Sequence, residues 1–172
     1  MIEPLYPKEI IKHFRNPKNL GRIEDTDAVG EAGNLACGDV MRIYLKIKKG
    51  KKGRIISDIK GEVFGCIVAI ANTSMLTTMV KGKTIEEALK IDKEELIKRL
   101  GGREKIPAFK IHCSILAVEA LHEAIYNYYK KENLPIPKSL EEKHKRIQAT
   151  LKNIEERYKD FIEFERKILS NQ

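Results

Sequence analysis

The stretch VMRIYLKIKKGKKGRIISDIKGEVF, residues 40–64, decides the fold class of this chain. Apolar and polar residues alternate over residues 40–48, and one face carries Met41, Ile43, Leu45 and Ile47. A second alternation follows over residues 55–64, and it places Ile55, Ile59 and Val63 on one face. A turn rich in Lys and Gly joins the two segments. This pattern predicts an antiparallel hairpin with one buried face.

On both sides of the hairpin the sequence favours helices. Expected helices cover residues 7–14, 67–80, 84–89 and 92–100, with a long helix from about residue 114. Thr84 and Glu87 form a capping-box pattern at one of these starts. Residues 18–36 contain several glycines and are expected to be a loop. Strands that precede helices, without βαβ alternation, indicate an α+β fold: a small antiparallel β-sheet with helices packed on one face.

The C-terminal part of the sequence predicts an extra amphipathic helix. Residues 134–137, LPIP, have the composition of a linker. After it, apolar residues recur at alternating spacings of three and four, with His144 and Glu165 as exceptions. We therefore expect two parts, a domain at 1–133 and a helical extension at 138–172. The extension is expected to pack on the domain or to pair between chains, and docking to another partner is a weaker alternative.

Composition excludes several classes of protein. The 172 residues are 42% hydrophobic and 34% charged, and no apolar run is long enough to cross a bilayer. The start MIEPLYPKEI does not resemble a signal peptide, so a cytoplasmic protein is expected. The net charge of +8 is partly concentrated in KIKKGKKGR, residues 46–54. Without interleaved aromatic residues, this segment indicates a solvated hairpin tip and not a nucleic-acid site.

All three cysteines lie at junctions between expected elements. Cys37 precedes a strand, while Cys66 and Cys113 each precede a helix. An odd number of cysteines in a reducing compartment favours free thiols over disulfides. A helix N-terminus stabilises a thiolate, which is both a metal ligand and a nucleophile. The positions therefore indicate a site, although three unrelated buried thiols remain an alternative.

The residues around the cysteines supply a metal-ligand set. Its members are Cys37, Asp39, Cys66, His112 and Cys113. Three thiols and one imidazole would satisfy either a tetrahedral zinc ion or a [2Fe–2S] cluster. Asp39 is in excess of four ligands, and an exchangeable carboxylate suits a labile metal better than a permanent one. A catalytic His112–Cys113 dyad is disfavoured, because adjacent side chains rarely point at each other. His13, His122 and His144 are expected in surface or cap roles.

Several motifs resemble those of one family, the IscU/NifU-type scaffolds for iron–sulfur cluster assembly. They are ACGDVM at 36–41, FGC at 64–66, AIANTSML at 69–76, VKGKTIEEAL at 80–89 and KIHCSILAVEALHEAI at 110–125. The N-terminal YPKEIIKHFRNPKNLG is similar as well. The resemblance extends from about residue 6 to about residue 131.

The resemblance implies a scaffold, and not an enzyme, that assembles a transient [2Fe–2S] cluster from iron and persulfide sulfur. It implies a cysteine desulfurase, an electron donor and apo-protein acceptors as partners. By position, Cys37, Cys66 and Cys113 are the cluster cysteines and His112 is the fourth ligand, with Asp39 as its competitor in ligand exchange. Cys113 is the first choice for the persulfide acceptor, and Cys37 is the alternative. Zinc can occupy the same residues in cluster-free forms.

Three features depart from the family pattern. Ile67 and Val68 follow Cys66, where the family usually has Gly and Ser. IPAFK precedes Ile111 in place of the leucine-diproline-valine-lysine motif, which argues against an Hsp70-type chaperone as a partner. The helix at 138–172 lies beyond the usual family end and could support a homo-oligomer. A SufU-like zinc sulfurtransferase, which accepts sulfur without building a cluster, is the alternative function; the longer insertion expected of it between Cys66 and Cys113 is missing.

Overall fold

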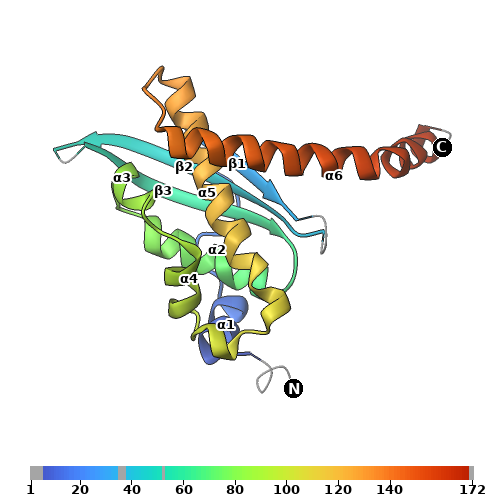
Figure 1. Ribbon diagram of the computed structural model, residues 1–172, viewed down its shortest axis with the longest axis horizontal. Coiled ribbons are helices and arrows are strands. Elements are labelled where there is room, and N and C mark those ends of the chain that lie inside the picture. The colour runs from blue at the N-terminus through green and yellow to red at the C-terminus, as the bar shows by residue number, and fades with distance from the viewer. Residues whose placement is uncertain (1–5, 35–37, 52, 171–172) are drawn as a thin grey trace.

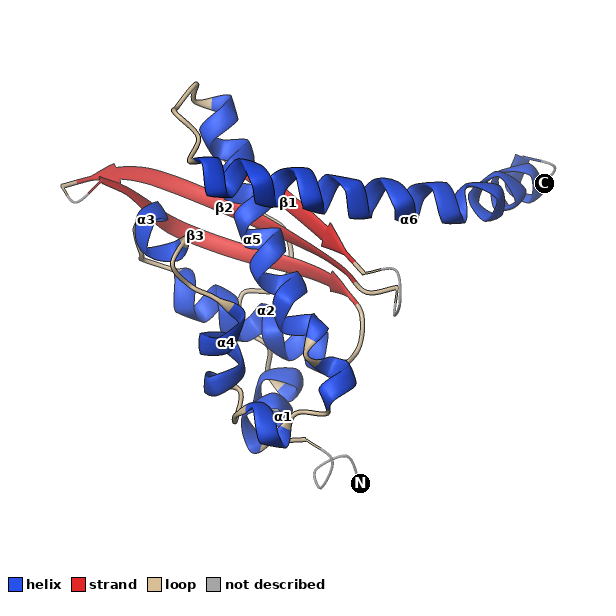
Figure 2. Cartoon of the chain, viewed as in Figure 1, coloured by secondary structure: helices blue, strands red, loops and turns tan. Residues whose placement is uncertain are grey.

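The chain forms a three-stranded antiparallel sheet with helices packed against one face (Figures 1 and 2). A computed structural model describes residues 6–34, 38–51 and 53–170, with side chains of the last helix after residue 159 described only at Glu163. The strands are β1 (Ala28–Gly33), β2 (Val40–Gly50) and β3 (Gly53–Phe64). The helices are α1 (Lys8–Arg15), α2 (Ile67–Val80), α3 (Ile85–Ala88), α4 (Lys93–Arg99), α5 (His112–Lys131) and α6 (Lys138–Ser170). Short 3₁₀ turns at Arg103–Lys105 and Ala108–Lys110 precede α5.

The predicted hairpin is confirmed as β2 and β3. Leu45 pairs with Ile59, and both are fully buried against the helices. At the basic tip, Lys48, Lys49 and Lys51 are exposed, as expected for a solvated turn. One expectation on β3 is wrong: a bulge between Lys46 and Ile47 shifts the alternation, so that Ile56 and not Ile55 is buried.

The expectation of a loop over residues 18–36 is also wrong, because this segment contains β1. Its glycines suggest an interruption of regular secondary structure, but Gly30 instead lies within β1 and allows close packing. A Cβ at Gly30 would lie 2.0 Å from the backbone nitrogen of Ala124 and 2.4 Å from the carbonyl oxygen of Ala120. Helix α5 therefore lies directly on β1 at a separation that no side chain at Gly30 would allow.

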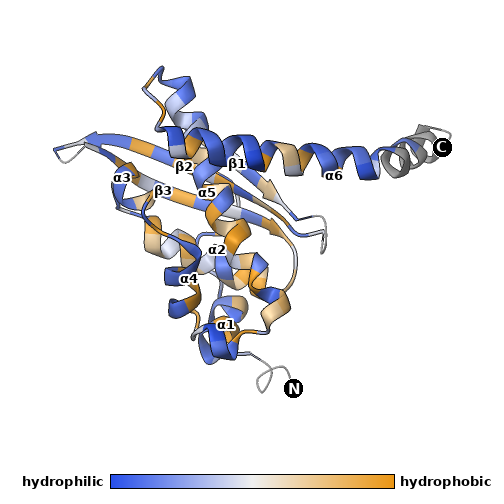
Figure 3. Ribbon diagram, in the orientation of Figure 1, coloured by the Kyte–Doolittle hydropathy of each residue, from blue (hydrophilic) through white to orange (hydrophobic). Residues whose placement is uncertain are grey.

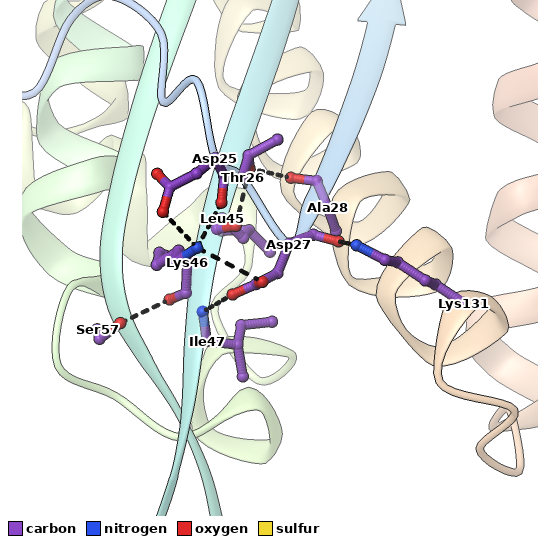
Figure 4. Close-up of polar contacts among 9 residues, drawn as sticks. All are labelled: Asp25, Thr26, Asp27, Ala28, Leu45, Lys46, Ile47, Ser57 and Lys131. Carbon is purple, nitrogen blue, oxygen red and sulfur yellow. Dashed lines mark hydrogen bonds and ion pairs between the residues drawn. The ribbon is translucent and has the colours of Figure 1, made fainter.

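The start of β1 is fixed to β2 and α5 by polar contacts (Figure 4). The Asp27 carboxylate accepts the backbone N–H of Ile47 at 2.7 Å, and its backbone carbonyl accepts from Lys131 at 3.0 Å. The Thr26 hydroxyl contacts the carbonyl oxygens of Ala28 and Leu45 at 2.9 and 2.8 Å. These contacts align β1 on the edge of the hairpin without help from large apolar side chains.

Apolar residues gather where the sheet meets α2 and α5 (Figure 3). Helix α2 is buried almost all round, which explains its lack of an amphipathic pattern. The capping box of Thr84 and Glu87 is confirmed. The expected surface roles of two histidines are wrong: His13 is buried and lies 2.7 Å from the Ser74 hydroxyl, and His122 is only 4% exposed.

The C-terminal helix α6 packs on the domain over its first turns and then extends past the sheet (Figure 1). Leu140 and Ile147 are buried, whereas Tyr158 is 41% exposed. His144, expected at the surface, instead lies 2.8 Å from the buried Glu123 carboxylate and stacks on Tyr126 at 3.7 Å between ring centroids. Over the part of the chain that the structure describes, no helix combines the length and apolarity that spanning a bilayer would require.

Candidate metal centre

Four of the five predicted ligands lie at the ends of three elements. Asp39 directly precedes β2, Cys66 is the N-cap of α2, and His112 and Cys113 are the first two residues of α5. Helix α5 thus begins two residues earlier than the sequence suggests. Cys37 falls outside the described residues, so its predicted place as a ligand stays a prediction.

The four described donors converge on the sulfur of Cys113. This sulfur lies 3.8 Å from Cys66 Sγ, 3.6 Å from Asp39 Oδ2 and 3.5 Å from His112 Nε2. The His112 nitrogen is in turn 3.9 Å from Asp39 Oδ2. Donor atoms of Asp39, His112 and Cys113 all lie within 4.8 Å of one another, and Cys66 joins them through Cys113.

The contact between His112 and Cys113 corrects one expectation. Adjacent side chains were expected not to meet, yet the imidazole nitrogen reaches the neighbouring sulfur. Both side chains turn toward Asp39 from the first turn of α5, which brings them together. The contact alone does not make a catalytic dyad, because the same nitrogen and sulfur also suit a shared metal.

The centre is largely shielded from solvent. Cys113 is fully buried and Asp39 is 5% exposed, while Cys66 and His112 are half-buried. Gly65 packs against the carboxylate: a Cβ there would lie 2.9 Å from Asp39 Cγ. The strand-to-helix junction before Cys66 therefore has room for Asp39 only because residue 65 has no side chain.

The pKa values of the two thiols are shifted in opposite directions. A hydrogen bond with Cys113 lowers the pKa of Cys66 to about 5, against the effect of burial, with help from backbone N–H groups of α2. The same hydrogen bond, burial and the nearby Asp39 raise the pKa of Cys113. Of the two thiols, Cys66 is therefore the one that ionises first.

Lys110 also belongs to the centre and was not among the predicted residues. Burial alone would lower its pKa, but a hydrogen bond with Cys66 and the charge of that thiolate raise it. The ammonium group therefore balances the negative charge of Cys66. The position of Lys110, two residues before His112 in KIHC, is a signal that could have suggested this role.

The donor atoms of Asp39, His112 and Cys113 have the spacing of three ligands on one tetrahedral metal. Ligand atoms 2.0–2.3 Å from one tetrahedral ion lie roughly 3.3–3.8 Å apart. The distances between neighbouring donors here are 3.5, 3.6, 3.8 and 3.9 Å. Two thiols, one imidazole and one carboxylate are ligand types that zinc and iron–sulfur centres accept. Cys66 lies beside Cys113 but outside this group of three, so its side chain has to move inward to join the same ion.

Comparisons with known proteins identify the family of this chain. The family described as "NifU-like N terminal domain" matches residues 5–134. This chain belongs to that family. It is 50% identical over 127 residues to the iron–sulfur cluster assembly scaffold protein IscU 1 of Archaeoglobus fulgidus, covering 74% of this chain and 78% of that protein. It is 43% identical, with the same coverage, to the IscU of Aquifex aeolicus.

Solved structures of the family share the fold. A candidate iron–sulfur cluster assembly scaffold for the SUF system from Fervidobacterium islandicum superposes with a TM-score of 0.58 at 25% identity. The match covers 71% of this chain and 97% of that one. The N-terminal NifU-like protein of Brucella abortus has the same TM-score at 24% identity, covering 76% of this chain and 98% of that one, which shows the fold alone. The expected resemblance to the IscU/NifU family and the expected fold class are confirmed.

Proposed function

We propose that this chain is a scaffold on which a transient [2Fe–2S] cluster is assembled and from which it is passed to apo-proteins. The convergence of Asp39, Cys66, His112 and Cys113 at one shielded point carries the proposal. We propose Cys37, Cys66, Cys113 and His112 as the cluster ligands. Asp39 competes with His112 for a position and so allows the cluster to leave.

Sulfur enters as persulfide from a cysteine desulfurase. Cys113 is the thiol that ionises less readily, so it first passes its proton to the neighbouring Cys66 thiolate. The Cys113 thiolate then attacks the terminal sulfur of the donor persulfide; the new S–S bond forms as the old one breaks, and the donor cysteine leaves as a thiolate. The sulfur of Cys113 is covered by Cys66, Asp39 and His112 in this structure. Acceptance at Cys113 therefore requires these side chains to part, and Cys37 is the competing acceptor. An electron donor then supplies the reduction that converts sulfane sulfur to sulfide.

Anaerobic reconstitution tests the proposal. The reduced chain is incubated with ferrous iron, cysteine and a desulfurase, and visible absorption and the iron-to-sulfide ratio are measured. We expect charge-transfer bands and equal iron and sulfide. Cys66→Ser should abolish them, while Ser57→Ala, a change of a hydroxyl on β3 away from the centre, should not. A reduced wild-type chain without charge-transfer bands would contradict the scaffold function.

A zinc-binding sulfur acceptor, SufU-like, is the second candidate. The spacing of Asp39, His112 and Cys113 and the likeness to a scaffold protein for the SUF system favour it. Metal analysis of freshly purified, anaerobically handled chain separates the two functions. One zinc per chain that iron and sulfide do not displace would favour the sulfur acceptor.

The proposal also covers the division of the chain into parts, its compartment and its partners. We propose that residues 1–133 form the scaffold domain and that residues 138–172 form an added helix that supports self-association. Free thiols at Cys66 and Cys113 suit a reducing compartment such as the cytoplasm. The IPAFK segment gives no reason to propose an Hsp70-type partner, and no nucleic acid or membrane is proposed.

A further inference from the structure

Helix α6 contacts two elements next to the metal centre, α5 and β1. Its first turns are held on α5, the helix that begins with His112 and Cys113. Glu123 of α5 is 2% exposed and accepts from His144 at 2.8 Å and from Gln148 at 2.6 Å. From this anchor α6 continues to the end of β1, after which the chain leads to Asp39.

The contact of α6 with β1 is centred on Gly33. A Cβ at this glycine would lie 2.7 Å from Ile154 Cδ1 and 3.4 Å from Leu151 Cδ2. The side chain of Ile154 therefore rests on the last residue of the strand. This close contact requires glycine at position 33 in β1, and it is made by the Cδ1 methyl group of Ile154 in α6.

The same point is tied to Asp39 through the backbone. The N–H of Asn34 donates to the carbonyl oxygen of Asp39 at 3.0 Å, and the N–H of Gly38 donates to the carbonyl oxygen of Asn34 at 2.9 Å. The Asp39 carbonyl oxygen is 3.8 Å from the position of the Gly33 Cβ. We call the described residues Asn34, Gly38 and Asp39 the β1–β2 connection.

Beyond Ile154, α6 no longer packs closely against the β1–β2 connection. A cavity of about 440 Å³ lies between the β1–β2 connection and α6, and its lining includes Gly38, Val40, Phe64 and Tyr158. Phe64 is 81% exposed beside it. The connection is thus held at its base by Ile154 and has open space at its outer side, so its freedom to move depends on the contact at Gly33.

We propose that α6 is a positioning helix for the metal centre: Ile154 holds the β1–β2 connection and thereby keeps Asp39 against His112 and Cys113. This role rests on the proposed function for its effect on the cluster. Loss of the contact loosens Asp39, so that ligand exchange quickens and a bound cluster or zinc ion leaves sooner.

Amide hydrogen exchange in the full metal-free chain tests the contact itself. We expect Ile154→Ala to speed exchange of the Asn34 and Gly38 amides several-fold. Gly33→Ala should do the same, because its new methyl meets Ile154 Cδ1. Adding Ile154→Val to Gly33→Ala should restore slow exchange, because valine lacks Cδ1. The control Lys152→Ala removes an exposed α6 side chain two residues before Ile154 and should leave both amides unchanged.

The effect on the centre is measured by the rate at which a chelator removes zinc or a reconstituted cluster. Ile154→Ala should raise the rate several-fold, and the Gly33→Ala, Ile154→Val pair should return it toward the wild-type rate. Amide exchange in Ile154→Ala equal to that in wild type or in Lys152→Ala would overturn the inference. If the wild-type chain takes up no cluster, the proposed function fails, while amide exchange and zinc release still decide the role of α6.

Discussion

At the scale of single residues, Asp39 allows a direct test of the proposed ligand exchange. Its carboxylate contacts both Cys113 and His112, as the proposed exchange requires. We expect Asp39→Ala to lengthen the half-life of a reconstituted cluster several-fold, because the competing ligand is gone. The measurement is the decay of visible absorption under a chelator. Asp58→Ala, which removes a carboxylate paired with Lys81 on β3, is the matched control. An equal or shorter half-life in Asp39→Ala would contradict the exchange role.

His122 predicts how stability depends on pH. Burial first, and then the charge of Lys143, lower its pKa to about 4 from an ordinary value near 6.5. The unfolded chain therefore binds a proton at a pH where the folded chain does not. The stabilisation is complete above pH 6.5 and is lost as the pH falls toward 4, by on the order of 3 kcal/mol. Urea unfolding at several pH values measures this loss.

The variant His122→Gln should flatten this pH dependence, since glutamine does not titrate. Some slope should remain, because burial also lowers the pKa of His13. Charged groups that face the cavity beside His122 come from α5, α6, the segment before α4 and the first residue of α4: Glu119, Lys143, Arg146, Lys90, Asp92 and Lys93. Lys143→Met should narrow the pH window by raising the pKa of His122. An unchanged slope in His122→Gln would exclude this histidine as its source.

At the scale of elements, patterns that depend on local chemistry could be predicted and those that depend on close packing could not. The alternation in β2 and the capping box of α3 are visible in the sequence and are confirmed. Strand β1 was missed because its core-facing residues are small, and Gly30 is needed only once α5 lies on it. The bulge in β3 depends on pairing with β2, which the sequence of β3 alone does not specify.

The metal centre shows the same division. Cysteines at element junctions indicate a site, because helix starts can be recognised from sequence. Side-chain directions at the start of α5 determine the contact of His112 with Cys113. They also determine the difference in pKa between the Cys66 and Cys113 thiols. Three-dimensional neighbours determine these directions, so sequence reasoning could name candidate ligands but not which thiol ionises first.

The attachment of α6 to α5 can be measured with a double-mutant cycle. Glu123 is buried and its partner His144 has 21% of its side chain exposed, so removal of either leaves the other poorly satisfied. For Glu123→Ala and His144→Ala we expect a coupling energy of about 1–3 kcal/mol in urea unfolding. The more exposed pair Arg146–Glu119 joins the same two helices at 2.9 Å and should couple by less than about 1 kcal/mol. Equal coupling in both pairs would contradict a buried anchor.

At the scale of the whole molecule, the length of α6 exceeds what the domain can cover. The helix runs to Ser170, while the NifU-like family match ends at residue 134. Its early apolar residues are buried on the domain, and Tyr158 is already exposed. The spacing of apolar residues in the sequence nevertheless continues at residues 161 and 168. A heptad pattern that outlasts its own domain favours a partner helix from a second copy of the chain.

This proposal predicts self-association that depends on the end of α6. Light scattering after size exclusion, over a range of chain concentrations, should give a dimer for the wild type. Phe161→Glu should shift the chain toward monomer, because a charge in the apolar seam cannot be buried in a pair of helices without cost. Lys152→Glu, at an exposed position of the same helix, should leave the dimer intact, apart from a weak dependence on salt. A wild-type chain that is monomeric at every concentration would contradict pairing and would leave α6 with its contacts to α5 and β1 alone.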